Sequence, residues 1–461
     1  MVSEILNCLD LPSGIGLLSA WIEAQMAYRG QPGLSIAVVR NQDLIWSRGF
    51  GYADIEKKVE TTPKTRYRIA SITKLFTATS IMQLRDKGKL SLDDEVATHL
   101  PWFKLKKTYP ETPPIRIWHL LTHTSGLPRE APTPYWTDSA FPTRETVIKL
   151  ISTQEAAAPT ETLWKYSNLA LTLAGEIVQE VSNTPYTKYV EKNILKPLGM
   201  SDTLIEPPDP NDPKLAKGYG RRLPNGSRDF SSYTDCKGIT PAANMTTTSE
   251  DLAKFAKLQL RDGPEGGDQI LHGSTLREMH RPHWLQPDWK EGFGIGFKIT
   301  RIGNRTYVGH GGAVQGFRTN IRINPADKTA VIVLTNSDDG LPLNYVEKAF
   351  QWLTYPLTKG EVDTSGPDLA PYSIYHGIYR DAWSDMQMLT LNGGLYVVDP
   401  SQLDPNPSLI KLTPDGKHIF KMYPEDGSGS YGENMTFEFN ELGRVTRVKR
   451  GENYSYPVMS W

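Results

Sequence analysis

Apolar positions along the first fifty residues follow two different periods. Leu17 to Tyr28 carries apolar side chains three and four residues apart, which predicts an amphipathic helix. Two short apolar runs follow at residues 34–39 and 44–47, and the polar residues Asn41-Gln42-Asp43 separate them. Runs of this length around a polar turn predict a β-hairpin. The chain is therefore expected to begin with one helix and two antiparallel strands.

Helical spacing dominates the middle of the chain, and strand patterns return after residue 290. We expect helices over residues 71–88, 117–121, 143–152, 168–181, 185–195, 248–260 and 343–353. We expect strands over residues 292–299, 306–309, 317–323 and 330–334, joined by turns as an antiparallel meander. Strands from both ends of residues 1–355 then enclose the helices. This order predicts an α/β fold of the α+β type, in which an antiparallel sheet is flanked by helices and carries an inserted helical subdomain.

The last hundred residues have a different composition and pattern. Residues 359–371 are rich in Gly, Pro, Asp and Ser, which predicts a linker. From residue 372 to residue 461, short β-like runs alternate with turns, and this spacing predicts a small antiparallel β-barrel. We therefore expect one domain over residues 1–358 and a second over residues 372–461.

Composition and charge narrow the classes of partner. The chain of 461 residues has 51 Lys and Arg against 52 Asp and Glu, which argues against nucleic acid and against an anionic membrane surface. No stretch approaches the ~20 apolar residues of a membrane span. Met1 to Leu6 lacks the basic region and the apolar segment of a signal peptide. We expect a cytoplasmic protein.

Cysteine and histidine spacing predicts neither a disulfide framework nor a metal site. Cys8 and Cys236 are too few for a framework and are expected to be free thiols. His280 and His283 lie close together, but no carboxylates or cysteines at ligand spacing accompany them. We assign them no metal role.

The strongest chemical signal is Ser71-Ile72-Thr73-Lys74, at the start of the helix expected over residues 71–88. Ser71 and Lys74 lie three residues apart, so they share one face of the first helical turn. A serine nucleophile needs a base, and Lys74 supplies one if burial lowers its pKa. The alternative is a serine N-cap beside a solvated lysine. A second Ser-x-x-Lys, at Ser408 and Lys411 in the expected barrel, is interpreted as having no function.

Tyr166-Ser167-Asn168 is the first of two motifs that give Ser71 its expected partners. It occurs directly before the helix expected over residues 168–181. Lys74 is then either the base itself or a fixed cation that favours a Tyr166 phenolate, and the choice stays open. On its own, Asn168 is also explained as a helix cap.

His310-Gly311-Gly312 is the second motif. It is expected to end a strand, where Gly312 lets a backbone approach a ligand closely. The backbone N–H groups of Ser71 and Ala313 are expected to form an oxyanion hole. On its own, His310 is also explained as a turn histidine with tertiary hydrogen bonds.

The order and spacing of these three motifs resemble those of the serine β-lactamase-like superfamily. The similarity is to its class C-like branch, which includes class C β-lactamases, family VIII carboxylesterases, D-aminopeptidases and related penicillin-binding-protein homologues. The segment His119-Leu120-Leu121-Thr122-His123-Thr124-Ser125-Gly126-Leu127 is also similar to that branch. The resemblance covers roughly residues 15–355.

This resemblance implies a role for each motif residue. Ser71 is the acyl-accepting nucleophile, and Lys74 and Tyr166 share the proton transfer. Asn168 positions Lys74 or the acyl amide of the substrate. His310 and Gly312 line the edge strand against which the substrate lies. No metal ion or organic cofactor is implied.

The third motif departs from the Lys-Thr-Gly of many β-lactamases and D,D-peptidases. Here Gly311 supplies no hydroxyl, and His310 is expected to be only partly charged near pH 7. A substrate carboxylate is therefore expected to be held less firmly. This favours a carboxylesterase-like hydrolase of small ester, amide or short peptide substrates that forms an acyl-serine.

Other functions stay open beside the esterase. A D-amino-acid-specific peptidase or aminopeptidase and a β-lactamase are the enzymatic alternatives. A slow-turnover penicillin-binding sensor or scaffold protein is the alternative of another class. The expected barrel resembles the lipocalin-like appendage of some D-aminopeptidase relatives, in which such domains assist oligomerisation. A homo-oligomer is therefore also open.

Overall fold

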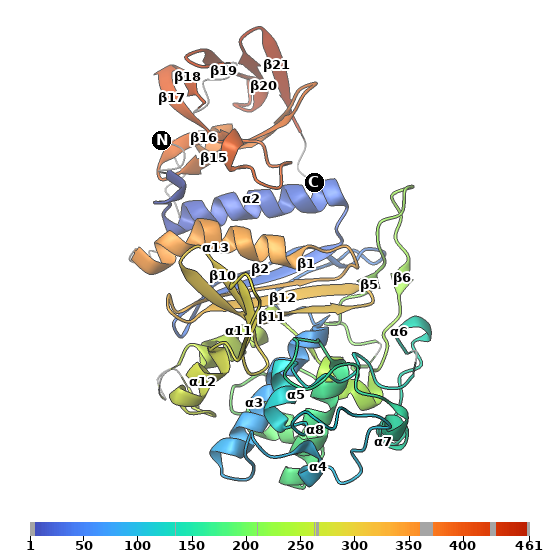
Figure 1. Ribbon diagram of the computed structural model, residues 1–461. Helices are drawn as coiled ribbons and strands as arrows, with labels where there is room; N and C mark the ends of the chain where they lie inside the picture. Colours follow the sequence, from blue (N-terminus) through green and yellow to red (C-terminus); the bar gives the residue numbers. More distant parts are fainter. Residues whose placement is uncertain are drawn as a thin grey trace. The chain divides into compact units, whose positions relative to one another are not determined.

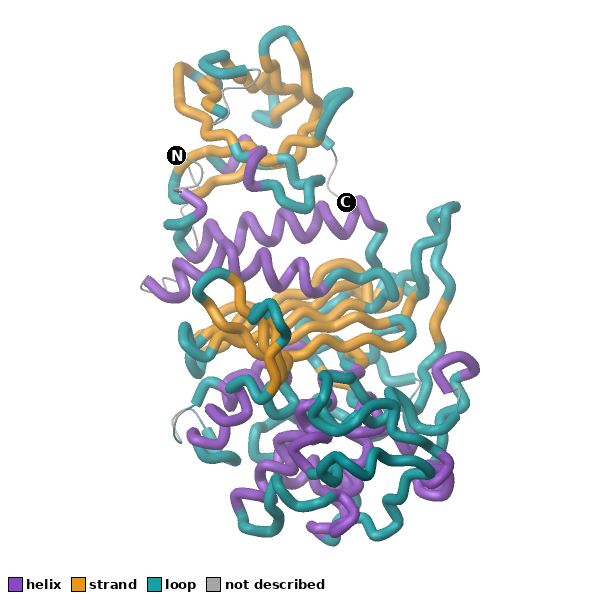
Figure 2. Tube along the Cα trace, in the orientation of Figure 1, coloured by secondary structure: helices purple, strands orange, loops and turns teal. Residues whose placement is uncertain are grey.

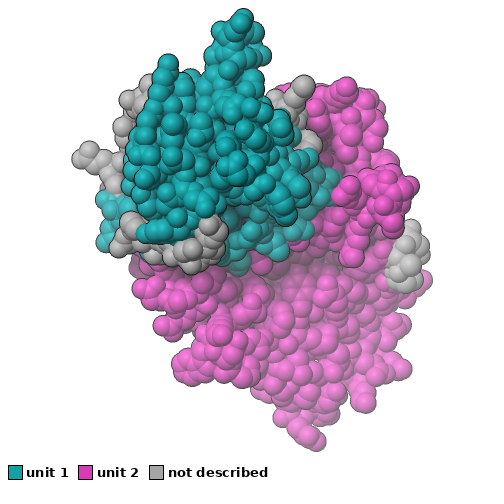
Figure 3. Space-filling model, turned by 90° about the horizontal axis from the view of Figure 1, so that it is seen from above, with its two compact units in different colours: residues 1–31, 347–461 teal, residues 32–346 magenta. Residues whose placement is uncertain are grey.

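The computed structural model describes residues 5–133, 135–209, 211–261, 263, 267–359, 372–424 and 430–458. The chain divides into two compact units, shown in different colours in Figure 3. Unit 2 is Pro32–Val346, and unit 1 combines Met1–Gln31 with Glu347–Trp461. The linker predicted over residues 359–371 lies outside the described residues except for Lys359. The domain boundary predicted after residue 358 stays a prediction.

Unit 2 contains one antiparallel sheet built from both ends of this unit (Figure 1). Its strand order is β3 (Val59–Glu60), β2 (Asp43–Asp54), β1 (Gly33–Arg40), β13 (Thr329–Thr335), β12 (Phe317–Asn324), β11 (Arg305–Val314), β10 (Lys298–Ile302), β9 (Glu291–Phe293) and β8 (Trp284–Leu285). β1 pairs with β13 from Leu34 opposite Thr335 to Arg40 opposite Thr329. Strands nearly 300 residues apart thus meet at the centre of the sheet, which confirms the predicted sheet.

Along the chain, the helices of unit 2 lie mainly between β4 (Tyr67–Arg68) and β8. Figure 2 shows helices in purple and strands in orange. They are α3 (Thr73–Asp86), α4 (Val96–His99), α5 (Ile117–Thr122), α6 (Tyr135–Asp138), α7 (Arg144–Leu150), α8 (Asn168–Ser182), α9 (Tyr186–Val190), α10 (Thr240–Ala243), α11 (Ser249–Gln259) and α12 (Gly273–His280). Short 3-10 turns η1 (Ala70–Ile72), η2 (Ile151–Thr153) and η4 (Lys237–Ile239) and the π-helical η3 (Glu191–Leu195) connect them. Two small ribbons pair β4 (Tyr67–Arg68) with β7 (Thr246–Thr247) and β5 (Gly218–Tyr219) with β6 (Phe230–Ser231).

Packing inside unit 2 places η1 between the sheet and the helices. α11 packs on β1 and β13, while α3, α8 and α10 pack on one another. η1 contacts β11 and β12 on one side and α3 and α10 on the other. The inserted helical subdomain expected from the sequence is therefore present, and the segment with Ser71 lies at its junction with the sheet.

The strand predicted over residues 292–299 is wrong in its bounds. Residues 292–299 were expected to be a single strand, but the structure divides them into β9 and β10. Gly296 has a φ of 80°, which lies in the left-handed region that favours glycine. Its N–H donates to Leu121 O at 2.9 Å, and an added Cβ would lie 2.5 Å from Ala78 Cβ. A close approach to the helices thus interrupts the strand.

Unit 1 contains two long helices and a closed barrel. α2 (Leu11–Arg29) begins at Asp10, whose side chain accepts the Ser13 N–H at 2.7 Å, and most of α13 (Pro342–Lys359) also belongs to this unit. The barrel strands are β14 (Gly377–Arg380), β15 (Asp385–Leu391), β16 (Gly394–Val398), β17 (Ile410–Gly416), β18 (Ile419–Tyr423), β19 (Asn434–Phe439), β20 (Val445–Arg450) and β21 (Asn453–Pro457), with the 3-10 turns η5 (Ser373–Tyr375) and η6 (Asn406–Ser408). The predicted barrel is confirmed.

Side chains fill the barrel interior. Buried residues from its strands, among them Met388, Phe420 and Phe437, form one cluster with Tyr375 of η5. Tyr375 and Phe437 contact each other with their ring centroids 4.6 Å apart. Among the described helices of the whole chain, none combines the length and apolar character that a membrane crossing requires.

Candidate active site

Ser71 lies in η1, the 3-10 turn that leads into α3. The sequence predicted Ser71 as a possible N-cap, but α3 begins at Thr73, after Ile72, and has no side-chain cap. The Ser71 hydroxyl is therefore free of a capping role. The preceding residue, Ala70, has a φ of 45°, an uncommon backbone conformation for a residue with a side chain. The nucleophile candidate thus follows a sharp backbone turn and is partly exposed.

Close contacts with the sheet fix this turn. An added Cβ on Gly312 would lie 2.1 Å from Ile69 O and 2.2 Å from Thr319 Oγ1. Thr319 Oγ1 donates to Ile69 O at 3.3 Å, and the Ile69 N–H donates to Met245 O at 2.9 Å. Gly312 therefore permits β11 to approach the backbone two residues before Ser71.

Lys74 is completely buried and its Nζ faces three oxygen atoms. The distances are 3.0 Å to Ser71 Oγ, 2.7 Å to Asn168 Oδ1 and 2.8 Å to Ala242 O. Burial lowers the pKa of the Lys74 ammonium to about 7. In its ammonium form Lys74 donates to all three oxygen atoms. In its neutral form the amine keeps two hydrogens, and when the two carbonyl oxygens accept them the lone pair is left for Ser71. The geometry thus suits Lys74 as a base for Ser71.

Tyr166 is the second group on the Ser71 oxygen. Its OH donates to Ser71 Oγ at 2.9 Å, and Lys74 Nζ lies 5.0 Å from the centre of its ring. Burial raises the pKa of the Tyr166 phenol above its ordinary value. Tyr166 is therefore protonated near neutral pH, which suits it as a donor to Ser71 rather than as a resting base.

Asn168 and Glu130 extend this network away from Ser71. The cap of α8 is Ser167, whose Oγ accepts the Ala170 N–H at 3.0 Å, so Asn168 has no capping role. Asn168 Oδ1 accepts from Lys74, and its Nδ2 donates to both carboxylate oxygens of Glu130 at 2.9 and 3.0 Å. Glu130 lies in a loop without a motif, so no sequence pattern points to it. The carbonyl of Ala242 is a backbone atom, which also leaves no signal in the sequence.

His123 packs against the segment that contains Tyr166. It ends α5 with a φ of 60°, and its Nδ1 accepts the Ser167 N–H at 3.2 Å. Its ring lies 4.5 Å from that of Tyr166, and burial lowers the pKa of His123 well below its ordinary value. Gly126 has a φ of 69°, and an added Cβ there would lie 2.0 Å from Ala158 O. The conspicuous His119–Leu127 segment therefore acts as a scaffold for Tyr166.

His310 differs from the sequence expectation in two ways. It was expected to end a strand, but β11 continues through it to Val314. It was also expected to be partly charged, but burial and the nearby Lys74 lower the pKa of His310 to about 3. Its Nδ1 lies 2.6 Å from Gly311 O, so the neutral ring donates from this nitrogen. His310 is thus a neutral side chain beside the site.

The remaining residues of this motif lie on an edge of the sheet. β10 pairs with β11 only between Arg305 and Gly309, so β12 is the only strand in the described part of the chain that pairs with His310–Val314. Gly311 and Ala313 are exposed, while Gly312 faces the Ser71 turn. Residues 310–314 of β11 thus have one unpaired side, and the expectation that the substrate lies against it stays a prediction. The oxyanion role of the Ser71 and Ala313 N–H groups stays a prediction.

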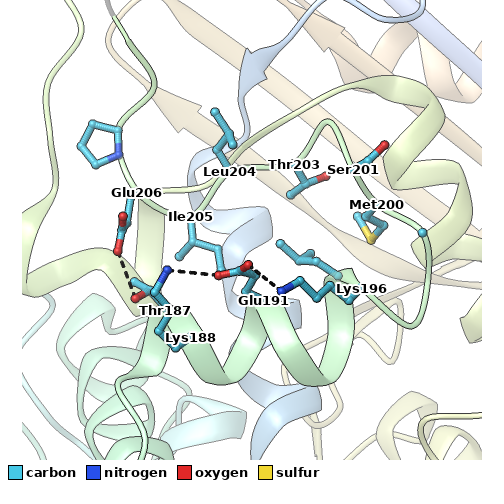
Figure 4. Close-up of a pocket in the computed structure, with 13 residues that line it drawn as sticks. Thr187, Lys188, Glu191, Lys196, Met200, Ser201, Thr203, Leu204, Ile205 and Glu206 are labelled. Atoms are coloured by element: carbon cyan, nitrogen blue, oxygen red, sulfur yellow. Dashed lines mark hydrogen bonds and ion pairs between the residues drawn. The ribbon is translucent and has the colours of Figure 1, made fainter.

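Two other features lie outside this cluster. Ser408 of the second Ser-x-x-Lys donates to Pro405 O at 2.7 Å and accepts the Asp399 N–H at 2.9 Å, so it stabilises a turn of the barrel unit. A hollow lined by α9, η3 and residues 199–207 contains ion pairs of Glu191 with Lys188 and Lys196 (Figure 4). None of the Ser71 cluster residues lines it.

A serine oxygen shared by a buried lysine and a tyrosine, between an antiparallel sheet and inserted helices, is typical of β-lactamase-like serine hydrolases. The chain belongs to the Beta-lactamase family, whose sequence model matches residues 18–355. This confirms the superfamily predicted from the three motifs.

Similar proteins extend this assignment. Protein flp of Staphylococcus aureus (strain N315) is 31% identical over 326 residues, which cover 70% of this chain. The match spans 62% of the length of that relative. The structure of an octameric penicillin-binding protein homologue from Pyrococcus abyssi has a TM-score of 0.66 and 26% identity, and covers 96% of this chain and 99% of its own. A D-stereospecific amidohydrolase from Streptomyces sp. has a TM-score of 0.61 and 25% identity, over 72% of this chain and 97% of its own.

Proposed function

We propose that this protein hydrolyses small carboxylic esters through an acyl-Ser71 intermediate. The observation that carries the proposal is the pair of contacts on Ser71 Oγ, at 3.0 Å from Lys74 Nζ and 2.9 Å from Tyr166 OH. One partner accepts the serine proton and the other is a proton donor. A helix-cap serine beside a solvated lysine would show neither a buried amine nor a second hydroxyl.

In the proposed acylation step, Ser71 Oγ attacks the ester carbonyl carbon and its proton moves to the lone pair of Lys74 Nζ. The carbonyl oxygen becomes an oxyanion, which the N–H groups of Ser71 and Ala313 are proposed to stabilise. Collapse of the tetrahedral intermediate breaks the bond to the leaving alcohol. Tyr166 OH protonates the departing oxygen, and the Lys74 ammonium then returns a proton to the Tyr166 phenolate.

Deacylation repeats the same chemistry with water as the nucleophile. Water loses a proton to the Lys74–Tyr166 pair as it attacks the acyl carbon, and Ser71 Oγ leaves and recovers a proton. The products are the carboxylic acid and free Ser71. Asn168 and Ala242 accept two hydrogens of Lys74 Nζ in both protonation states, so the remaining position on Nζ, which is a lone pair in the neutral amine, is directed at Ser71.

The ester preference is argued from the edge strand. His310 is neutral and buried, and Gly311 has no hydroxyl, so neither side chain supplies the charge or hydrogen bond that holds a carboxylate in Lys-Thr-Gly sites. A substrate without a carboxylate beside its scissile bond loses nothing by this change. β-Lactams and peptides that end in a free carboxylate lose a binding contact.

Amide hydrolysis at a D-amino-acid residue is the second candidate. It is supported by the similarity to the D-stereospecific amidohydrolase, of which 97% of the chain is covered at 25% identity. The proposed chemistry at Ser71 is the same, and the leaving group is an amine. A homo-oligomer also stays a prediction, which the similarity to the octameric P. abyssi protein supports.

A substrate panel with the Ser71→Ala variant tests the proposed function. The panel contains p-nitrophenyl esters of increasing chain length, D- and L-aminoacyl p-nitroanilides and a cephalosporin. We expect the esters to give the highest kcat/KM and Ser71→Ala to lower it by at least about a thousandfold. Mass spectrometry after a fluorophosphonate probe should find the adduct on Ser71.

Other results of this panel would refute the proposed site or the ester preference, or would favour a different function. Unchanged turnover in Ser71→Ala would refute the site. Efficient turnover of the cephalosporin with negligible ester hydrolysis would refute the ester preference, and a preference for D-aminoacyl anilides would favour the amidase. A β-lactam adduct at Ser71 that never hydrolyses would favour the penicillin-binding sensor.

A further inference from the structure

The Glu130 carboxylate binds three donor side chains next to the proposed catalytic pair. Asn168 Nδ2 donates to Oε1 and Oε2 at 2.9 and 3.0 Å. Tyr135 OH donates to Oε2 at 2.5 Å, and Arg129 Nε donates to Oε1 at 3.0 Å. The Glu130 side chain is only 24% exposed. Protein donors rather than bulk water therefore satisfy most of this carboxylate.

Two hydrogen bonds to backbone carbonyls fix the Glu130 loop, one of them from the first residue of α8. The Asn168 N–H donates to Arg129 O at 2.7 Å, and Gln154 Nε2 donates to Glu130 O at 2.9 Å. The carboxylate thus has a defined position relative to the residue that begins α8. The position of the loop backbone therefore brings the Glu130 carboxylate close to Asn168.

The two ends of the Asn168 amide have opposite partners. Its Nδ2 faces an anion, Glu130, and its Oδ1 faces the amine of Lys74 at 2.7 Å. A rotated amide would place its oxygen against the carboxylate, which is repulsive, and would leave the Lys74 hydrogen without the amide oxygen that accepts it. Glu130 therefore determines which end of Asn168 faces Lys74.

Groups of both signs face Lys74. They are the carboxylate of Glu130, the guanidinium of Arg129, the thiol of Cys236, the phenol of Tyr166 and the imidazoles of His123 and His310. Burial lowers the pKa of Lys74, Glu130 opposes this fall and Arg129 adds to it. Burial also raises the pKa of the Cys236 thiol to about 11, so this thiol is uncharged near neutral pH.

We propose that Glu130 is a positioning residue for the reaction at Ser71. Through the Asn168 amide it keeps Lys74 Nζ directed at Ser71 Oγ, and its negative charge favours the ammonium form of Lys74 over the free amine. The inference rests on the proposed function, in which neutral Lys74 accepts the Ser71 proton. Glu130 itself does not touch the reacting atoms.

The test compares pH profiles of Glu130→Gln and wild-type protein. The measurements are kcat/KM for a p-nitrophenyl ester and the rate of fluorophosphonate labelling of Ser71, both from pH 5 to pH 10. Without the Glu130 charge, the protonated form of Lys74 is less stable and the pKa of Lys74 falls. The acid limb of the pH profile should therefore move to lower pH by at least about one unit. Glu161→Gln is the matched control, because Glu161 contacts His119 at 2.8 Å rather than Asn168. Its acid limb should stay at the wild-type pH.

A second variant separates charge from position. Glu130→Asp keeps the charge but shortens the side chain, so its rate plateau should fall about tenfold or more while its acid limb stays near the wild-type pH. This variant also provides the readout if Glu130→Gln does not fold, and a limb displaced to lower pH in folded Glu130→Asp would then overturn the inference.

Two results distinguish failure of this inference from failure of the proposed function. If Glu130→Gln folds and is slower but keeps the wild-type acid limb, Glu130 has only a structural role and the inference is overturned. If the wild-type protein is not labelled at Ser71 at any pH, the proposed function fails and this inference fails with it.

Discussion

Gly311 and Gly312 are neighbours on β11, and they provide a matched pair of substitutions. An added Cβ at position 312 would lie 2.1 Å from Ile69 O, whereas ordinary contacts begin at 3.4 Å. β11 and the Ser71 turn would therefore have to separate by roughly 1 Å in Gly312→Ala. At position 311 the nearest atoms to the added Cβ are Asn320 Nδ2 at 3.5 Å and Thr319 O at 3.7 Å, both in ordinary contact.

The expected effects follow from this difference. A displacement of about 1 Å between catalytic groups and substrate costs on the order of a hundredfold in rate. Overpacking of this kind costs about 1–3 kcal/mol of unfolding free energy, or roughly 1–5 °C in the midpoint of thermal unfolding for a unit of this size. We expect Gly312→Ala to lose both activity and stability and Gly311→Ala to keep kcat/KM within about threefold.

Ester hydrolysis and thermal unfolding of the two variants, measured side by side, check this reasoning. The p-nitrophenyl ester assay gives kcat/KM, and circular dichroism gives the unfolding midpoint. A Gly312→Ala protein with wild-type activity would refute the close approach of β11 to the Ser71 turn. Equal losses in both variants would refute the argument that position 312 alone faces this turn.

Two further predictions concern pH and substrate. Burial lowers the pKa of Lys74 to about 7, and neutral Lys74 is the proposed base. The kcat/KM of the wild-type protein should therefore fall about tenfold per pH unit below pH 7 and level off above it. A pH profile without an acid limb near 7 would contradict this. Gly311→Thr restores a hydroxyl on the exposed face of β11, where an added Cβ fits. A hydrogen bond to a charged group contributes about 1.5–3 kcal/mol, so the rate of cephalosporin acylation relative to ester acylation should rise about tenfold. An unchanged ratio in stopped-flow measurements would show that Gly311 does not limit carboxylate binding.

The sequence predicted most of the fold because its patterns are local. The hairpin at residues 34–47, the antiparallel strands up to residue 335 and the C-terminal barrel each follow from alternation and turn residues. The division at Gly296 escaped prediction, because its cause is a contact with Ala78 and Leu121 more than 170 residues away. Periodicity does not encode such distant contacts.

The candidate site divides in the same way. Ser71, Lys74, Tyr166 and Asn168 were identified because their motifs are short and contiguous, and the structure brings them together. Glu130 lies in no motif. Only tertiary packing brings its carboxylate to the Asn168 amide, so no local pattern identifies it. The charge of His310 was predicted wrongly, because the sequence gives the side chain but not its burial.

Unit 1 is built from two segments at opposite ends of the chain, and this delays its folding during synthesis on the ribosome. Trp21 Nε1 donates to Gln402 O at 2.9 Å, and Gln25 Nε2 donates to Pro400 O at the same distance. The first pair is separated by 381 residues, which take roughly 20–80 s to translate at ~5–20 residues per second. These bonds of α2 must therefore wait until nearly the whole chain has been made, and a ribosome that stops before Pro400 releases a chain in which neither bond can form.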